Sequence, residues 1–372
     1  MCALVNFSRI VVKLGTSTLT AETARISPPR LVELVQQMAQ LHNNGQDIVV
    51  VSSGAIAAGR EGLDYPRLPK DIPAKQMLAA VGQPRLMALY QQLFELYGLT
   101  TAQVLLTRVD LADRRRYLNS RNTLEALISQ RVIPIVNEND TVATEEIRVG
   151  DNDNLSALVA NLIEADLLIL LTDQAGLYTA DPRLDSQAEM VQEVSSPEIP
   201  ESLWQAAGGA AGELGTGGMV TKLQAADLAR RSGITVVIAR GSDSDVLLQI
   251  AAGERLGTRF LPSGSALESR KRYILAGRRS GGCLIVDEGA VQALQRGGSL
   301  LPIGVKGFSG KWERGDSVSV LDLAGHEIAR GLVNYAVADL QRILGHRSDE
   351  IEALLGFAYG DEVIHRNNMV LL

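Results

Sequence analysis

The sequence predicts an α/β domain with a mostly parallel sheet and helices on both faces, followed by a small β-rich domain. Two observations carry this prediction. Up to about Phe260, short apolar runs alternate with helical stretches, and these runs hold Val, Ile and Leu at both parities, as in strands covered on both faces. From about Lys271, short β-like runs are separated by glycine-rich turns, which is typical of a compact β domain.

The first domain is expected over residues 1–262. Its expected strands are Arg9–Leu14, Asp47–Val51, Thr101–Leu106, Val132–Val136, Asp166–Leu171 and Thr235–Ala239. The helices expected between them are Pro29–Asn43, Ala74–Tyr97, Arg115–Gln130, Asn154–Ala165 and Met219–Ser232. The first helix opens at two prolines and ends near Gly45, which is favourable chemistry at both ends. Residues 184–215 are rich in Ala and Gly with weak patterning, and we expect a mobile loop there.

The second domain is expected over residues 276–372, after a polar linker at 263–275. Its expected strands are Tyr273–Leu275, Cys283–Val286, Ser317–Leu321 and Glu327–Leu332, with one helix at Gly289–Arg296. The first of these runs overlaps the linker, so the boundary between linker and domain falls close to it.

Composition excludes several classes of protein. Hydrophobic residues make up 46% and charged residues 21%, which suits a folded chain rather than a disordered one. No apolar run approaches the roughly 18 residues of a membrane span, and the N-terminus lacks the basic region of a signal peptide. The two cysteines, Cys2 and Cys283, form no CxxC pair, which argues against a disulfide scaffold or a cysteine zinc site and suits a reducing cytoplasm. The net charge of −7 argues against a chain built as a whole to bind polyanions.

Polar, glycine-bearing segments follow the expected strands, at the edge where open α/β sheets bind ligands. They are KLGTS after the first strand, VSSGAIAAG after the second, NENDTV and then GDNDNLSA after the fourth, LLTDQAGLYTADP at the fifth, and GTGGMVTK at 215–222. Glycine lets a backbone approach phosphate closely, and the start of a helix favours an anion. Together these segments predict an anion-binding site.

Each segment taken alone has a plainer interpretation. A Gly-Ser turn before a helix can be only a cap, and NENDTV and GDNDN can be polar turns. Asp151, Asp153 and Asn154 could form a cation loop, but the EF-hand pattern fails because Leu155 stands at the fifth position and no glycine follows at the sixth. Neither GxxxxGK[ST] nor GxGxxG occurs, which disfavours a P-loop or dinucleotide-binding fold.

The residue types narrow the reaction class. Two lysines, several backbone-donor turns and a few aspartates are the components of a phosphoryl-transfer site, where positioning and charge neutralisation dominate. The four histidines, His42, His326, His346 and His365, lie outside every motif, so no Ser/His or Cys/His mechanism is supported. An acceptor that is already an anion, such as a carboxylate, needs no general base, and this favours a carboxylate over an alcohol.

Six motifs in order carry a resemblance to a known family: VVKLGTS, VSSGAIAAG, IVNENDTVAT, RVGDNDNLSALVA, LLTDQAGLYTADPR and GTGGMVTKLQAA. The chain resembles the glutamate 5-kinase branch of the amino acid kinase family, and its C-terminal part resembles the PUA domain of many bacterial members. The resemblance implies an amino acid kinase-like fold in a cytoplasmic enzyme. It also implies transfer of the ATP γ-phosphoryl group to the side-chain carboxylate of L-glutamate, the first step of proline biosynthesis. Mg²⁺ is implied as a bridge on the phosphates, with few or no protein ligands.

The resemblance also implies roles for individual residues. It implies catalytic roles for Lys13, Lys222 and Asp153, with Asp153 holding the two lysines rather than taking a proton. It places glutamate on Ser53, Asp140 and Asn152. It places the nucleotide on Lys13, Thr172, Asp173, Thr216, Gly217, Gly218, Met219, Val220, Thr221 and Lys222. It assigns no metal-ligating side chain.

The partners implied are L-glutamate, proline as a feedback inhibitor, further copies of the chain in a homo-oligomer, and glutamyl-phosphate reductase as recipient of the product. No membrane partner is expected. Basic residues at the start of the second domain could bind RNA: Arg270, Lys271, Arg272, Arg278 and Arg279. However, residues 270–372 hold 13 basic and 12 acidic side chains, which favours an interface or regulatory role over RNA binding.

Two alternatives stay open at this point. One is an RNA-binding regulator that uses the α/β domain as a scaffold. The other, within the enzyme class, is a sister kinase that acts on N-acetylglutamate or aspartate.

Overall fold

The computed structural model describes residues 7–69, 71–143, 152–182, 184–208, 218–265 and 279–372. The chain divides into two compact units. Unit 1 comprises Met1–Leu111 and Ser120–Ala266, and unit 2 comprises Ala112–Asn119 and Leu267–Leu372. Within the described residues, no helix is long and apolar enough to cross a membrane.

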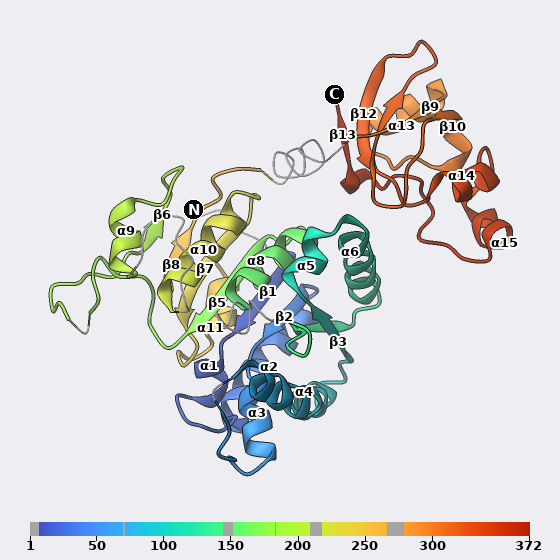
Figure 1. Ribbon diagram of the computed structural model, residues 1–372. Helices are drawn as coiled ribbons and strands as arrows, with labels where there is room; N and C mark the ends of the chain where they lie inside the picture. Colours follow the sequence, from blue (N-terminus) through green and yellow to red (C-terminus); the bar gives the residue numbers. More distant parts are fainter. Residues whose placement is uncertain (1–6, 70, 144–151, 183, 209–217, 266–278) are drawn as a thin grey trace. The chain divides into compact units, whose positions relative to one another are not determined.

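Unit 1 contains an eight-stranded sheet in its described part, with strand order β3-β4-β2-β1-β5-β7-β8-β6 (Figure 1). The strands are β1 (Arg9–Leu14), β2 (Asp47–Ser52), β3 (Thr101–Leu106), β4 (Ile133–Glu138), β5 (Leu167–Thr172), β6 (Glu193–Val194), β7 (Thr235–Arg240) and β8 (Thr258–Phe260). Neighbouring strands from β3 to β7 are parallel, β7 and β8 are antiparallel, and β8 and β6 are parallel. The predicted mostly parallel sheet is confirmed.

Helices cover both faces of this sheet. They are α1 (Thr16–Thr20), α2 (Pro28–Asn43), α3 (Ala55–Gly62), α4 (Ile72–Glu95), α5 (Arg108–Ala112), α6 (Arg114–Ser129), α8 (Asn152–Leu162), α9 (Glu201–Ala206), α10 (Met219–Arg230) and α11 (Val246–Ala251). Ile10, Val12 and Leu14 of β1 join one core cluster with α2, α4 and α11. Because side chains alternate along a strand, Lys13 points to the opposite face, where α8 and α10 pack.

Helix α3 begins after Gly54, where the sequence predicted the start of a helix, but its extent was not predicted, and its packing explains why. It is short and rich in Ala and Gly, so it carries little hydrophobic periodicity. It is held instead by close approach to α4 through glycines on both helices. A Cβ on Gly82 would lie 1.8 Å from the Ala55 carbonyl oxygen, and one on Gly59 would lie 1.9 Å from that of Leu78. The turn after β2 is therefore fixed against α4.

The expectation of a mobile loop over 184–215 is wrong for the part that the structure describes, 184–208. This part contains β6, which pairs with β8, and α9, which buries Leu203 and Trp204. The pairing partner of β6 follows more than sixty residues later, so local composition gave no sign of it. The rest of the expected loop, 209–215, lies outside the described residues.

The last segment of unit 1 is held by a buried arginine. Arg230, at the end of α10, is fully buried. Its Nε donates to the Leu261 carbonyl over 3.0 Å, and its Nη2 donates to the Ser196 carbonyl. The backbone N–H of Ser263 in turn donates to the Arg230 carbonyl over 3.0 Å. These bonds fix the chain up to residue 263 on the α/β domain.

Unit 2 is β-rich, as predicted. Its described part contains a five-stranded sheet with order β10-β9-β11-β12-β13. The elements are β9 (Arg279–Val286), α13 (Glu288–Gln295), η1 (Pro302–Gly304), β10 (Val305–Ser309), β11 (Ser317–Leu321), β12 (Glu327–Leu332), α14 (Val337–Ile343), η2 (Ser348–Glu350), α15 (Ile351–Leu355), η3 (Arg366–Asn368) and β13 (Met369–Leu371). The expected strand Tyr273–Leu275, the basic residues 270–278 and most of the expected linker lie outside the described residues.

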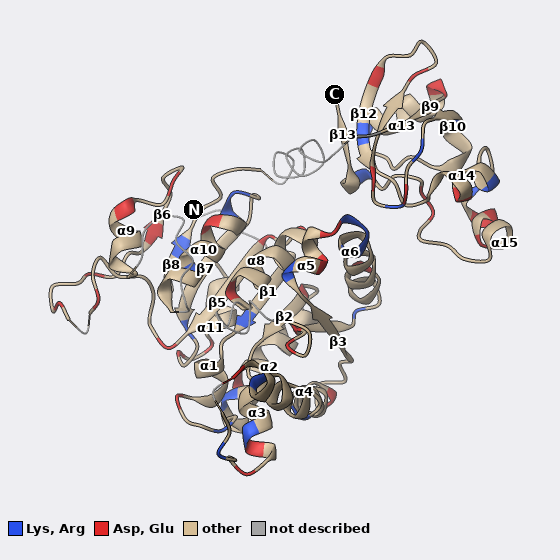
Figure 2. Ribbon diagram, in the orientation of Figure 1, with Lys and Arg blue, Asp and Glu red and all other residues tan. Residues whose placement is uncertain are grey.

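The core of unit 2 is closed by aromatic and aliphatic side chains. Trp312 is buried, and its indole N–H donates to the Tyr335 carbonyl over 3.1 Å. Leu118, from the segment of α6 that belongs to this unit, is fully buried with Leu332 and Val370. Basic and acidic residues are interspersed along the elements of unit 2 (Figure 2).

We expect a chain that ends at Gly264 to fold. It keeps the unit 1 sheet and the bonds of Arg230, but it exposes Leu118, whose packing partners are lost. The exposure of Leu118 should make unit 1 of the shortened chain less stable than unit 1 of the full chain. We expect its free energy of unfolding, measured by urea denaturation, to be lower by about 2 kcal/mol. Leu118→Ala should destabilise the full chain and have little effect on the shortened one. Equal costs in both chains would contradict this assignment of Leu118.

Candidate active site

The predicted site residues lie on segments at the carboxyl ends of the central strands. Lys13 is one residue from the end of β1 and is in register with Val51 of β2 and Leu170 of β5. Asp140 follows β4, and Thr172 ends β5. In parallel strands these ends lie at one edge of the sheet, so residues far apart in sequence come together there.

Two lysines bind the same buried carboxylate. The Nζ of Lys13 lies 2.5 Å from Oδ1 of Asp153, and the Nζ of Lys222 lies 3.3 Å from Oδ2. Thr221 donates from Oγ1 to Oδ2 over 2.7 Å. The side chain of Asp153 is only 5% exposed, that of Lys13 6% and that of Lys222 12%. The structure thus brings together the three residues predicted to be catalytic.

The electrostatics of Asp153 follow from these contacts. Burial acts to raise its pKa, but the charges of Lys13 and Lys222 and the hydrogen bonds from Lys13 and Thr221 outweigh burial and lower the pKa to about 2. The carboxylate is therefore ionised throughout the neutral range. It holds two cations at one point and is a poor proton acceptor, as expected for a positioning role.

Asn152, the first residue of α8, lies beside Asp153 and faces the second strand. Its Nδ2 lies 2.9 Å from the Ser52 carbonyl, 3.0 Å from Ser53 Oγ and 3.0 Å from Asn137 Oδ1. The carbonyl oxygen of Ser52 can only accept a hydrogen bond, so the side-chain nitrogen of Asn152, and not its oxygen, must face Ser52. The Oδ1 of Asn152 is buried and has no hydrogen-bond partner among the described residues.

Asp140 follows β4 and is half-buried. Burial raises its pKa to about 6. It is thus a carboxylate whose charge changes just below neutral pH. Of the three residues predicted to bind glutamate, Ser53 and Asn152 are hydrogen-bonded to each other, and Asp140 lies on the loop that follows the strand of Asn137.

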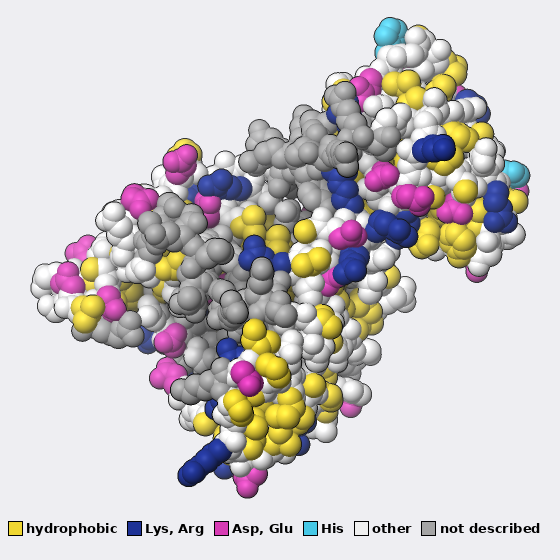
Figure 3. Space-filling view, viewed as in Figure 1, with side chains coloured by type: hydrophobic (Ala, Val, Ile, Leu, Met, Phe, Trp, Pro, Cys, Tyr) yellow, Lys and Arg dark blue, Asp and Glu magenta, His cyan; other side chains and the backbone are white. Residues whose placement is uncertain are grey.

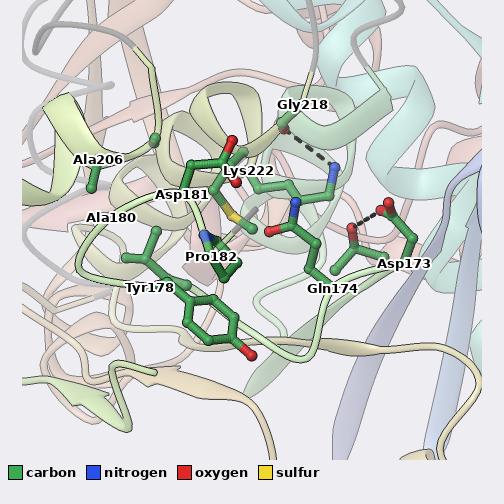
Figure 4. A pocket seen from close by; sticks show the side chains of 13 residues that line it. Asp173, Gln174, Tyr178, Ala180, Asp181, Pro182, Ala206, Gly218 and Lys222 are labelled. Carbon is green, nitrogen blue, oxygen red and sulfur yellow. Dashed lines mark hydrogen bonds between the residues drawn. The ribbon is translucent and has the colours of Figure 1, made fainter. Parts of the chain in front are cut away.

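A pocket of about 320 Å³ adjoins Lys222 (Figure 4). It is lined by Thr172, Asp173, Gln174, Leu177, Tyr178, Ala180, Asp181, Pro182, Ala206, Ala207, Gly218, Met219 and Lys222. Thr172 donates to Asp173 over 2.9 Å, and Lys222 reaches back to the Gly218 carbonyl over 3.3 Å. The volume of the pocket lies within the usual range of about 300–1,000 Å³ for small-molecule sites.

The predicted nucleotide residues divide into four groups. Lys13 is not among the lining residues of the pocket and forms an ion pair with Asp153. Thr172, Asp173, Gly218, Met219 and Lys222 line the pocket. Val220 and Thr221 are buried and do not line it, and Thr221 bonds to Asp153 instead. Thr216 and Gly217 lie outside the described residues.

Two residues next to the site were missed by sequence reasoning. Asn137 stands in the NEND motif, where its position beside Asp140 could have suggested it. Gln83 lies in the middle of a long helix, and nothing in the local sequence marks it. In the part of the chain that the structure describes, no group of three His, Cys, Asp or Glu side chains is placed to hold a metal ion.

Comparison with known proteins gives a consistent result. Residues 8–240 match the model of the amino acid kinase family, and residues 282–355 match that of the PUA domain. The chain is 55% identical to the glutamate 5-kinase of Photobacterium profundum over 98% of its own length and 96% of that protein's. It is 54% identical to the glutamate 5-kinase of Shewanella amazonensis, with 99% and 97% covered, and 53% identical to that of Deinococcus radiodurans, with 98% and 100% covered. A solved UMP kinase from Bacillus anthracis is 14% identical with a TM-score of 0.48, over 69% of this chain and 97% of that one.

We expect Asp153→Asn to lower the free energy of unfolding by about 3 kcal/mol, because it removes the negative charge that two almost buried lysine ammonium groups share. Urea denaturation at neutral pH measures this. Asp173→Asn, the same change at an exposed carboxylate of the pocket, serves as the control and should cost far less. Similar stabilities for the two variants would show that Asp153 does not hold the lysines.

Proposed function

The chain belongs to the amino acid kinase family and carries a C-terminal PUA domain, and we propose that it is a glutamate 5-kinase. It transfers the γ-phosphoryl group of ATP to the side-chain carboxylate of L-glutamate, which yields L-glutamyl 5-phosphate and ADP. This is the first step of proline biosynthesis. Relatives of that name cover nearly the whole chain at 53–55% identity.

The main support for the proposal is that Lys13 and Lys222 both form ion pairs with Asp153. Phosphoryl transfer proceeds through a loose transition state in which charge spreads over the phosphoryl oxygens. Two ammonium groups fixed in advance by one ionised carboxylate suit that charge, because they need no rearrangement when it develops.

The reaction needs no general base in this arrangement. A carboxylate oxygen of glutamate attacks the γ-phosphorus as the bond from that phosphorus to the β–γ bridging oxygen breaks, and the electron pair leaves with ADP. The attacking group is already ionised near neutral pH, so no proton has to be removed. The pKa of Asp153, about 2, agrees with a residue that positions the lysines and takes no proton.

We place glutamate on the side of Asn152 and Ser53, and the nucleotide in the pocket beside Lys222. Asn152 Oδ1 lacks a partner among the described residues and can accept from the α-ammonium group. Asp140 supplies a negative charge for the same group. Mg²⁺ would arrive on the ATP phosphates and neutralise their charge during transfer, and we assign it no protein ligand.

Several further features belong to the proposal. We propose that the enzyme works in the cytoplasm as a homo-oligomer, that proline inhibits it, and that glutamyl-phosphate reductase receives its labile acyl phosphate. For the PUA domain, we propose an interface or regulatory role rather than RNA binding, since both charge signs are spread over its elements. Residues 1–262 are the proposed catalytic domain.

The direct experiment is an acyl phosphate trap. The purified chain is incubated with ATP, Mg²⁺ and hydroxylamine, together with glutamate, aspartate or N-acetylglutamate in separate reactions. Hydroxamate formed with glutamate alone supports the proposal. Preference for another acceptor would reassign the chain to a sister kinase, and no product with any of them would remove the proposed activity.

Lys13→Ala and Lys222→Ala should each lower kcat about a hundredfold, because each removes a charge that meets the phosphoryl group chiefly in the transition state. The glutamate KM should change far less. Steady-state kinetics in the hydroxamate assay measures both constants, and Lys75→Ala, an exchange of the same kind on α4, is the control. Wild-type kcat in either lysine variant would remove that residue from the reaction.

The pKa of Asp140 predicts a pH dependence of glutamate binding. Since burial raises this pKa to about 6, the binding charge is present above that pH and is lost below it. The kcat/KM for glutamate should therefore rise between pH 5 and 7 and then level off, while the KM for ATP stays nearly constant. Asp140→Asn should lower kcat/KM and flatten this rise. An unchanged pH profile in the variant would exclude Asp140 as its source.

A further inference from the structure

Helix α4 presents three polar side chains at intervals of seven residues, Gln76, Gln83 and Tyr90. Seven residues are nearly two helical turns, so the three side chains share one face of the helix. Each forms a hydrogen bond with a different segment next to the proposed glutamate site. We call these three residues the α4 polar stripe.

The three residues of the stripe contact the loop after β4, the end of β4 and the end of β2. Gln76 Nε2 donates to the Ala143 carbonyl over 3.1 Å, on the loop that carries Asp140. Gln83 Oε1 accepts from Asn137 Nδ2 over 2.8 Å, at the end of β4. The hydroxyl group of Tyr90 lies 2.9 Å from Ser52 Oγ, at the end of β2.

Gln83 is the member that leads directly to a proposed binding residue. The Oδ1 of Asn137 accepts from the backbone N–H of Glu138 over 2.9 Å and from Asn152 Nδ2 over 3.0 Å. A backbone N–H can only donate, so the orientation of the Asn137 amide is fixed, and its nitrogen must face Gln83. The chain of amides Gln83–Asn137–Asn152 therefore has one orientation, in which Asn152 Oδ1 is left to accept.

The environment makes this chain sensitive to change. Asn137 is 1% exposed, Asn152 7% and Gln83 9%, so water cannot readily replace a lost hydrogen bond. The glycine contacts between α3 and α4 hold the helix that carries the stripe against the helix that follows β2. On the outward side, hydrophobic side chains gather over α3 and α4 (Figure 3). The polar residues of the stripe point inward instead, where the burial of Gln83 and Tyr90 places them.

We propose that Gln83 is a positioning residue for substrate binding, and that the α4 polar stripe sets the affinity for the amino acid without touching the reacting atoms. The proposal rests on the proposed function, since it assigns the glutamate α-ammonium group to Asn152. Gln83 acts through Asn137, and Tyr90 acts through Ser52, the neighbour of Ser53. The hydrogen bonds of Gln83 and Tyr90 lead to the ends of β4 and β2, and neither residue is among the lining residues of the nucleotide pocket.

The test uses Gln83→Met in the full-length chain, which keeps the length of the side chain and removes the acceptor. The glutamate KM should rise about tenfold while kcat and the ATP KM stay within about twofold. Gln91→Met is the matched control, because Gln91 is exposed on the same helix and its Nε2 donates to Glu95 over 2.7 Å. A fall in kcat, or an equal rise in both KM values, would show a general structural effect and overturn the proposal.

A double-variant experiment separates positioning from mere stability. If Gln83 acts through the amide chain, Gln83→Met should change the glutamate KM by less than about twofold when Asn152 is already Ala. A full tenfold effect in that background would overturn the proposal. If Gln83→Met does not fold, Tyr90→Phe, which removes one oxygen atom, should still raise the glutamate KM about threefold, and an unchanged KM would contradict the role of the stripe.

The two proposals fail in different ways. Absence of hydroxamate with glutamate in the wild-type chain rejects the proposed substrate. A wild-type chain that is active with glutamate, together with a Gln83→Met variant of unchanged KM, rejects only the role of Gln83. If the wild type prefers aspartate, which shares the α-ammonium group, the same variants are compared with aspartate.

Discussion

The carboxylate of Asp153 holds Lys13 and Lys222 within 3.3 Å, and the rest of the site is arranged around that contact. Two ammonium groups at such a distance from one point repel each other, and their burial limits screening by water. The ionised carboxylate at the same point offsets this repulsion. Strand β1 and helix α10 are consequently tied to α8, and the two positive charges are in place before any ligand binds.

Helix α8 separates two different environments. On one side its first residue, Asn152, enters a network of amides and hydroxyl groups that ends on α4. On the other side, Asp153 reaches the pocket through Lys222. Hydrogen bonds with fixed donors and acceptors suit recognition of a small zwitterion, and a lysine beside an open pocket suits a phosphate chain. The proposed reaction needs these two functions on either side of one transferable group.

The C-terminal unit has a well-formed core of its own, with Trp312 and Tyr335 at its centre. It also includes Ala112–Asn119, a segment that lies between two parts of unit 1 in the sequence. Leu118 is fully buried within unit 2. The predicted linker divides the sequence into two consecutive parts. The packing instead assigns one internal segment of the first part to unit 2.

The fold class followed from the sequence, and the motifs together with the family resemblance singled out the candidate site residues. The strand Arg9–Leu14 was located to the residue, because a buried parallel strand is a short apolar run with sharp ends. The edge strand Thr101–Leu106 was also located to the residue, although most of it is only partly buried. Lys13, Asp153 and Lys222 were found because each stands in a motif at a strand end or a helix start. The tertiary structure alone decided what these residues contact. It gave Thr221 to Asp153 rather than to the pocket, placed β6 and α9 where a loop was expected, and brought Gln83 to Asn137 across 54 residues. Such contacts depend on which helix face meets which strand end, and a local pattern of residues does not contain that information.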